Sequence, residues 1–150
     1  MAQSLSQVYL HIIFSTKNRQ KKIHPEIEAE LYKYLAGILK GLDSPAIIVG
    51  GYLNHIHILC RLSRMKSISN IMAILKKDSS RWIKTKSEKY RDFYWQNGYG
   101  VFSVSMSHVE RVKKYIENQK EHHKKMNFKE EYITFLEKYQ IEYDERYVWD

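Results

Sequence analysis

Apolar residues recur along this chain with two different spacings, and the two spacings predict different elements. Gln7–Ser15 alternates apolar positions and is rich in β-branched and aromatic residues, which predicts a strand. Pro25 suits the first turn of a helix, apolar residues follow it at helical spacing, and Gly41 is expected to end that helix. The apolar runs Ala46–Gly50 and Asn54–Leu62 then predict a β-hairpin that turns at Gly50 and Gly51.

The second half of the chain is predicted to hold three helices and one strand. Ser67 is expected to cap a helix whose apolar stripe is Ile68, Ile71, Met72, Leu75 and Trp82. Val101–Ser105 predicts a short strand. Ser107 and Glu110 have the spacing of a capping box, which predicts a helix from there to about His123. A last amphipathic helix is predicted from Phe128, Tyr132, Phe135, Leu136 and Tyr139.

The predicted order of the first six elements is β-α-β-β-α-β. We therefore expect an α+β, ferredoxin-like split β-α-β fold, in which a four-stranded antiparallel sheet carries two helices on one face. The other face needs a cover, and the helix that starts near Ser107 is the candidate, from the same chain or from a partner. At 150 residues, we expect residues 1–150 to form a single domain.

Composition places few limits beyond these. Hydrophobic residues make up 43% of the chain, which is ordinary for a globular protein, and no apolar run approaches the ~18 residues that span a bilayer. The first residues lack the basic and small-residue segments of a secretory signal. Cys60 is the single cysteine, and we interpret it as a small buried strand residue in a reducing compartment. These features favour a cytoplasmic protein without a membrane segment.

Charge is distributed unevenly. The formal net charge is +8, yet residues 61–91 hold ten basic and two acidic residues, and residues 127–150 hold three basic and seven acidic ones. Lys77, Arg81 and Lys84 fall on one helix face, which indicates a surface for a polyanion such as nucleic acid. A lysine-rich face that simply meets solvent is the alternative.

Two short patterns carry candidate chemistry. His55 and His57 point to the same side of a strand, where two imidazoles can grip a divalent metal. Tyr115 and Gln119 are four residues apart on a helix and therefore share a face. Each has a plain alternative, since a strand His pair is often half-buried, a helix Tyr is often core, and a helix Gln is often solvated. His122 and His123 are most simply the frayed end of that helix.

These residues resemble a known family. His55-Ile56-His57 is similar to the motif of the single-tyrosine HUH transposases of small bacterial insertion sequences, which include the REP-associated tyrosine transposases. Tyr115-Ile116-Glu117-Asn118-Gln119 is similar to the helix that carries the family's nucleophile and third metal ligand. The resemblance extends to Phe14-Ser15-Thr16-Lys17 and to Trp95-Gln96-Asn97-Gly98-Tyr99-Gly100. One departure is Asn54, where the family usually has Asp.

The resemblance implies a transposase that cleaves and rejoins single-stranded DNA bearing hairpins. Tyr115 would attack the scissile phosphate and form a 5′-phosphotyrosine, and His55, His57 and Gln119 would hold Mg²⁺ or Mn²⁺. It also implies a homodimer, in which Tyr115 can reach the histidines of the other protomer. The expected phosphate contacts are Lys76, Lys77, Ser80, Arg81 and Lys84.

Other functions stay open at this point. A domesticated hairpin-repeat nuclease would have the same residues, and a catalytically silent hairpin-binding protein would bind folded strands without forming a covalent adduct. A structural zinc protein is the weakest alternative, because one cysteine and one His-x-His fall short of four ligands.

Overall fold

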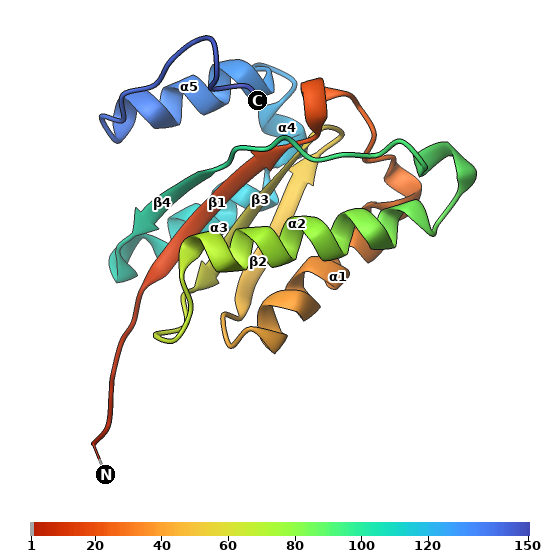
Figure 1. Ribbon diagram of the computed structural model, residues 1–150. Helices are drawn as coiled ribbons and strands as arrows, with labels where there is room; N and C mark the ends of the chain where they lie inside the picture. The colour runs from red at the N-terminus through yellow and green to blue at the C-terminus, as the bar shows by residue number, and fades with distance from the viewer. Residues whose placement is uncertain (1) are drawn as a thin grey trace.

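A four-stranded antiparallel sheet is the centre of the molecule (Figure 1). The computed structural model describes residues 2–150. The strands are β1 (Tyr9–Ser15), β2 (Ala46–Tyr52), β3 (His55–Arg61) and β4 (Gly100–Val104), in the spatial order β2-β3-β1-β4. The α+β split β-α-β fold expected from the sequence is confirmed.

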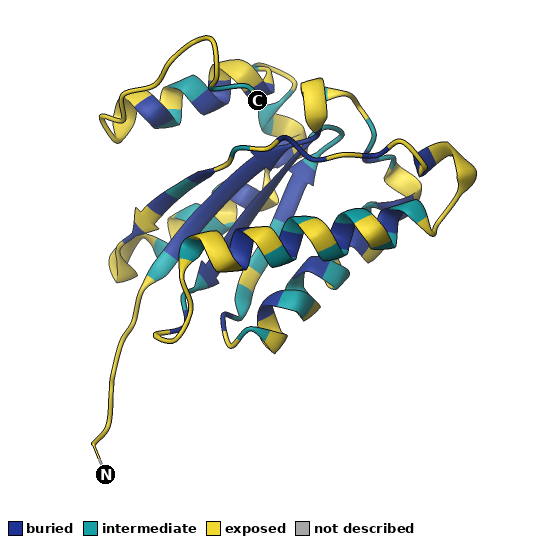
Figure 2. Ribbon diagram, in the orientation of Figure 1, coloured by how far each residue is buried: buried dark blue, intermediate teal, exposed yellow. Residues whose placement is uncertain are grey.

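Helices α1 (Pro25–Gly41) and α2 (Ile68–Lys84) cover one face of the sheet. Pro25 begins α1 as expected, and the Ser67 hydroxyl caps α2 by accepting a hydrogen bond from the Asn70 amide at 3.1 Å. This face is apolar, and the dark strands of Figure 2 show that the sheet is buried. Its sheet residues are Leu10, Ile12, Phe14, Ile56, Ile58 and Cys60. The interpretation of Cys60 as a buried strand residue is confirmed.

The opposite face is covered by the C-terminal third of the same chain. Helices α3 (Val109–Glu117) and α4 (Gln119–His122) lie over β2 and β3, and α5 (Phe128–Lys138) packs against β1 and β4. Short 3-10 turns, η1 (Lys17–Arg19), η2 (Glu88–Tyr90) and η3 (Met106–His108), connect the main elements. No partner is needed to cover this face.

Two sequence predictions are wrong in detail. The hairpin turns at Leu53 and Asn54, whereas Gly50 and Gly51 lie inside β2. A glycine is required at position 50 because an added Cβ would lie 2.8 Å from the Ile116 side chain of α3. Glycine at position 50 therefore permits the close approach of α3 to the sheet, and the turn predicted there is wrong.

The second error concerns the start and continuity of the tyrosine helix. Ser107 lies inside η3 and does not cap α3, whose N-cap residue is His108, and the Ser107 hydroxyl lies 3.2 Å from that of Ser105. The predicted single helix to His123 is interrupted at Asn118, whose backbone leaves the helical region. A 3-10 turn thus takes the place of the predicted capping box. Within residues 2–150, no helix is both long and apolar enough to cross a membrane.

Candidate active site

The two histidines of β3 face the layer of α3, α4 and α5. Because side chains alternate along a strand, Ile56 and Ile58 enter the apolar core while His55 and His57 point the opposite way. Both imidazoles are fully buried. Buried polar side chains need partners, so the surroundings of these rings identify the groups they act with.

Helix α3 brings Tyr115 and Gln119 to the same place. Gly50 allows Ile116 to rest on β2, and this contact sets α3 close to the neighbouring strand. The Gln119 Oε1 atom lies 2.9 Å from His55 Nε2, and the Tyr115 ring centre lies 5.8 Å from that of His57. The structure therefore brings together all four residues singled out for the catalytic and metal roles.

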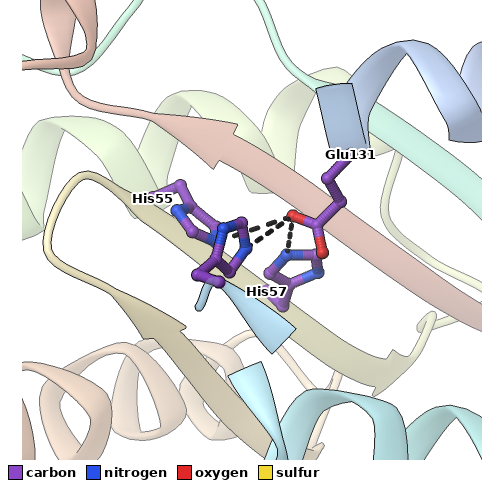
Figure 3. A group of neighbouring side chains, drawn as sticks. His55, His57 and Glu131 are labelled. Atoms are coloured by element: carbon purple, nitrogen blue, oxygen red, sulfur yellow. Dashed lines mark hydrogen bonds and ion pairs between the residues drawn. The ribbon is translucent and has the colours of Figure 1, made fainter. Parts of the chain in front are cut away.

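Two further side chains enter this site that the sequence analysis missed. Glu131 of α5 is 1% exposed and points between the two imidazoles, as Figure 3 shows. Its Oε1 lies 3.0 Å from His57 Nε2 and 3.6 Å from His55 Nε2. His123, interpreted above as part of a frayed end, has a side chain only 5% exposed and lies 3.0 Å from Gln119 Oε1. That interpretation is wrong.

Asn54 occupies the position of the family's usual Asp. Its Oδ1 lies 2.8 Å from His55 Nδ1, and its Nδ2 donates to the Arg19 carbonyl at 3.2 Å. The amide oxygen can only accept, so this contact favours the His55 tautomer with its proton on Nδ1 and a lone pair on Nε2. Asn54 therefore orients the ring as a carboxylate would, without the negative charge.

His11 of β1 supports the other ring. Its Nε2 lies 2.8 Å from His57 Nδ1, and the two buried imidazoles are tilted against each other. A proton on His57 Nδ1 bonded to His11 leaves His57 Nε2 free to face the interior of the site. Each histidine of the pair thus has a neighbour that turns its Nε2 inward.

Burial dominates the electrostatics. It lowers the pKa of His55 to about 3, with the neighbouring His57 adding to the effect, so His55 is neutral at pH 7. Burial alone would raise the pKa of Glu131, but the His57, His123 and His55 rings outweigh it and hold that pKa below its ordinary value. Burial and the Glu131 charge raise the pKa of Tyr115 well above its ordinary value. The phenol is therefore protonated and needs activation before it can attack.

The donor set fits a divalent metal ion. His55, His57, His123 and Glu131 each offer a ligand atom, and these atoms lie within 4.8 Å of one another. Ligands at right angles and about 2.1 Å from one ion are about 3.0 Å apart. The separations of 3.0 Å between His57 and Glu131 and 2.9 Å between His55 and Gln119 match that value. The cluster can therefore hold a metal.

A pocket leads to Tyr115 from the surface. Its volume is about 270 Å³. The walls come from β1, α3, α4 and α5 and from the segment that joins the last two, and they include His11, Arg111, Tyr115, His122, Glu131 and Lys138. Two of these side chains, Arg111 and Lys138, are positively charged, which suits an anionic substrate group beside the phenol.

Sequence comparison decides the family. The family model described as "Transposase IS200 like" matches residues 4–119 of this chain. The chain belongs to the IS200-like transposases. The match ends at Gln119, so Glu131, His122 and His123 of this transposase lie beyond the matched segment. Among curated protein sequences, none matches the chain significantly.

Solved structures agree on the fold of the transposase. A presumed transposase from Deinococcus radiodurans R1 is 22% identical, with a TM-score of 0.62 over 79% of this chain and 98% of that one. A REP-associated tyrosine transposase bound to a REP hairpin is 12% identical, with a TM-score of 0.60 over 82% of this chain and 74% of that one. At these identities the likeness concerns the fold.

The basic stripe lies on the other side of the transposase. Its residues are on α2, the helix layer opposite Tyr115, and they are Lys76, Lys77, Ser80, Arg81 and Lys84. The Lys76 ammonium bonds the carbonyl groups of Gln96, Asn97 and Gly98 at 2.5 to 3.0 Å, and burial lowers its pKa to about 8. Lys77 and Arg81 are exposed. The structure thus does not place the stripe beside the four predicted catalytic and metal residues.

Proposed function

We propose that this transposase cleaves and rejoins single-stranded DNA, with Tyr115 as the nucleophile. The observation that supports the proposal is the meeting of Tyr115, His55, His57 and Gln119 in one cluster, although the two sequence patterns that carry them lie about sixty residues apart. A tyrosine beside a metal-ligand set has the composition that metal-assisted phosphoryl transfer to a phenol needs.

The reaction would proceed by transesterification. The Tyr115 oxygen attacks the scissile phosphorus, an O–P bond forms to the phenol, and the bond from phosphorus to the 3′-oxygen breaks. The phenol proton ends on the released 3′-oxygen, which leaves a 5′-phosphotyrosine and a free 3′-hydroxyl. Attack of a 3′-hydroxyl on the phosphotyrosine reverses these steps and joins the strands without ATP.

His55, His57 and Gln119 would hold the divalent ion, which would polarise the phosphate and stabilise the charge that develops on it. Asn54 and His11 orient the two rings toward it. The candidates are Mg²⁺ and Mn²⁺, and imidazole ligands favour Mn²⁺ because Mg²⁺ prefers oxygen.

The substrate proposed is a strand folded into a hairpin. The solved REP-associated tyrosine transposase is bound to a REP hairpin, and this chain shares its fold. The α2 stripe would contact the phosphates of the stem, with Lys77 and Arg81 exposed for that role.

A covalent-adduct gel tests the proposal. Labelled hairpin strands with single-stranded flanks are incubated with Mn²⁺ and the protein, then separated under denaturing conditions. We expect a shifted band with the wild type and with the control Tyr147→Phe, whose ring is exposed. Tyr115→Phe should remove the band. Hairpin binding by the wild type without any band would instead identify a silent hairpin-binding protein.

A homodimer is proposed from the family resemblance, and its composite sites have a direct test. In this structure Tyr115 lies against the histidines of its own chain. Mixing His57→Ala with Tyr115→Phe protomers separates the two arrangements. Recovered cleavage would indicate sites shared between protomers, whereas a mixture as inactive as its components would indicate sites built within one chain.

A further inference from the structure

The two oxygens of Glu131 face different partners. Oε1 points at the imidazoles, 3.0 Å from His57 Nε2 and 3.2 Å from His123 Nε2. Oε2 accepts hydrogen bonds from the Tyr115 hydroxyl and, at 3.0 Å, from Gln119 Nε2. One carboxylate therefore touches both the candidate ligand set and the candidate nucleophile.

This carboxylate is buried without a permanent cation beside it. Its ion-pair partners within residues 2–150 are four histidines, and none is a lysine or arginine. A buried carboxylate needs compensating positive charge, which here must come from a protonated ring or from a bound ion.

The polar atoms around Glu131 are arranged for an ion. Gln119 Oε1 lies 2.9 Å and Glu131 Oε1 lies 3.6 Å from His55 Nε2, and the same Glu131 oxygen lies 3.0 Å from His57 Nε2. Two imidazole nitrogens and two oxygens therefore converge in a buried space, and each of these atom types can coordinate a divalent cation. A cation among them would supply the positive charge that the buried carboxylate needs.

We propose that Glu131 links the metal ion to the nucleophile. Oε1 is a ligand of the ion, beside His55, His57 and Gln119, and Oε2 holds the Tyr115 phenol in place. The inference rests on the proposed function, and it adds a residue that lies twelve positions beyond the segment matched by the family model. Glu131 thereby acts as a metal ligand and as a positioning residue for Tyr115.

This arrangement has two consequences. Glu131 changes the ligand set from two imidazoles and an amide to one that includes a negative charge, which strengthens binding of a divalent ion. It also makes the position of the phenol depend on the ion, because the same carboxylate holds both. Ion binding should therefore be detectable at Tyr115 in the absence of DNA.

Mn²⁺ titration tests the ligand. Free Mn²⁺ is measured by electron paramagnetic resonance with the wild type, Glu131→Gln and the control Glu130→Gln, whose side chain is exposed on the same helix. Loss of a hydrogen-bond partner of a metal ligand typically weakens affinity about 10- to 100-fold, so we expect a loss of at least about 10-fold when the ligand Glu131 itself is changed in E131Q, and none for E130Q. Equal affinity of E131Q and the wild type would overturn the proposal.

Fluorine NMR tests the link to Tyr115. The protein is labelled with 3-fluorotyrosine, and the Tyr115 signal is the one missing from Tyr115→Phe. Zn²⁺, a diamagnetic substitute, should shift this signal in the wild type and in E130Q. In E131Q, titrated until Zn²⁺ is bound, the signal should stay in place. A shift of equal size in E131Q would show that the ion acts on Tyr115 without Glu131.

Two measurements distinguish an error in the role of Glu131 from an error in the proposed function. A wild type that binds no Mn²⁺ would overturn the ion itself and the proposed function with it, whereas bound Mn²⁺ with an unaffected E131Q overturns this inference alone. Glu131→Asp keeps the charge on a shorter side chain, so it should bind Mn²⁺ more tightly than E131Q. If both variants fold by circular dichroism and bind equally weakly, the charge of Glu131 has no such role.

Discussion

The two faces of the sheet use the same strands for opposite purposes. On β3, Ile56 and Ile58 point into a core of aliphatic and aromatic side chains under α1 and α2. His55 and His57, their immediate neighbours, point into a cluster of polar groups under α3, α4 and α5. Both faces are equally buried, but only the first gains free energy from burial alone. The polar face must obtain its stability from hydrogen bonds around the histidines and from apolar contacts beside them, such as those of Ile13 and Phe102.

The largest effect is expected on the apolar face. Ile58→Ala should lower the free energy of unfolding by about 2–5 kcal/mol, because it leaves a cavity in a fully packed region. Urea denaturation measures this loss. Mn²⁺ affinity of the folded variant should equal that of the wild type at a low temperature. Weakened Mn²⁺ binding would show that the two faces are not independent.

Metal binding should stabilise the polar face. At an Mn²⁺ concentration 100 times the dissociation constant, the free energy of unfolding should rise by about 2.7 kcal/mol, and EDTA should reverse the rise. Thermal denaturation with and without Mn²⁺ provides the measurement. His57→Ala should lose the increase, and Ile58→Ala should keep it. An increase of the same size in His57→Ala would place the ion elsewhere.

His11 should matter next. His11→Phe keeps a ring among Phe102, Tyr115 and Phe135 but removes the partner of His57 Nδ1. We expect Mn²⁺ affinity to fall about 10-fold, at the low end for the loss of a hydrogen bond to a metal-binding histidine. The control is His108→Asn, on the exposed turn before α3, which should bind as the wild type does. Unchanged binding in His11→Phe would mean that His57 keeps its orientation unaided.

The smallest effect is expected at Asn54. Asn54→Asp places a negatively charged carboxylate beside His55 Nδ1. Mn²⁺ affinity should therefore rise a few-fold, equivalent to about 1 kcal/mol or less. The same change removes the hydrogen bond to the Arg19 carbonyl, which limits the gain. Isothermal titration calorimetry can resolve the difference. Weaker binding would mean that this second bond of Asn54 matters more than the charge.

The sequence predicted the elements well where a single local rule decides them. Alternating apolar residues identified β1, apolar runs identified β2 and β3, and Ser67 identified the start of α2. Prediction failed where another element decides, as at Gly50, whose role depends on the approach of Ile116. At Ser107, a 3-10 turn took the place of the expected cap.

The candidate site was half predictable. Motif spacing identified His55, His57, Tyr115 and Gln119, but nothing in a single motif indicated Glu131. A signal was present, because Glu131 falls three residues after Phe128 and four before Phe135, on the apolar side of α5. A carboxylate on the apolar side of a helix is expected to be buried, and a buried carboxylate needs a hydrogen-bond or charge partner. Choosing between Glu130 and Glu131 still required knowing which side of α5 meets the sheet.

The location of α5 beyond residue 119 determines how far the protein can be truncated. A protein that ends at residue 119 would retain every motif residue of the predicted site but would lack α5. It would also leave Ile13 and Phe102, which are covered by Phe128, Tyr132 and Leu136, open to water. Such a shortened product is expected to aggregate, so a minimal version should keep α5 together with Val148 and Trp149, which pack against the same cluster.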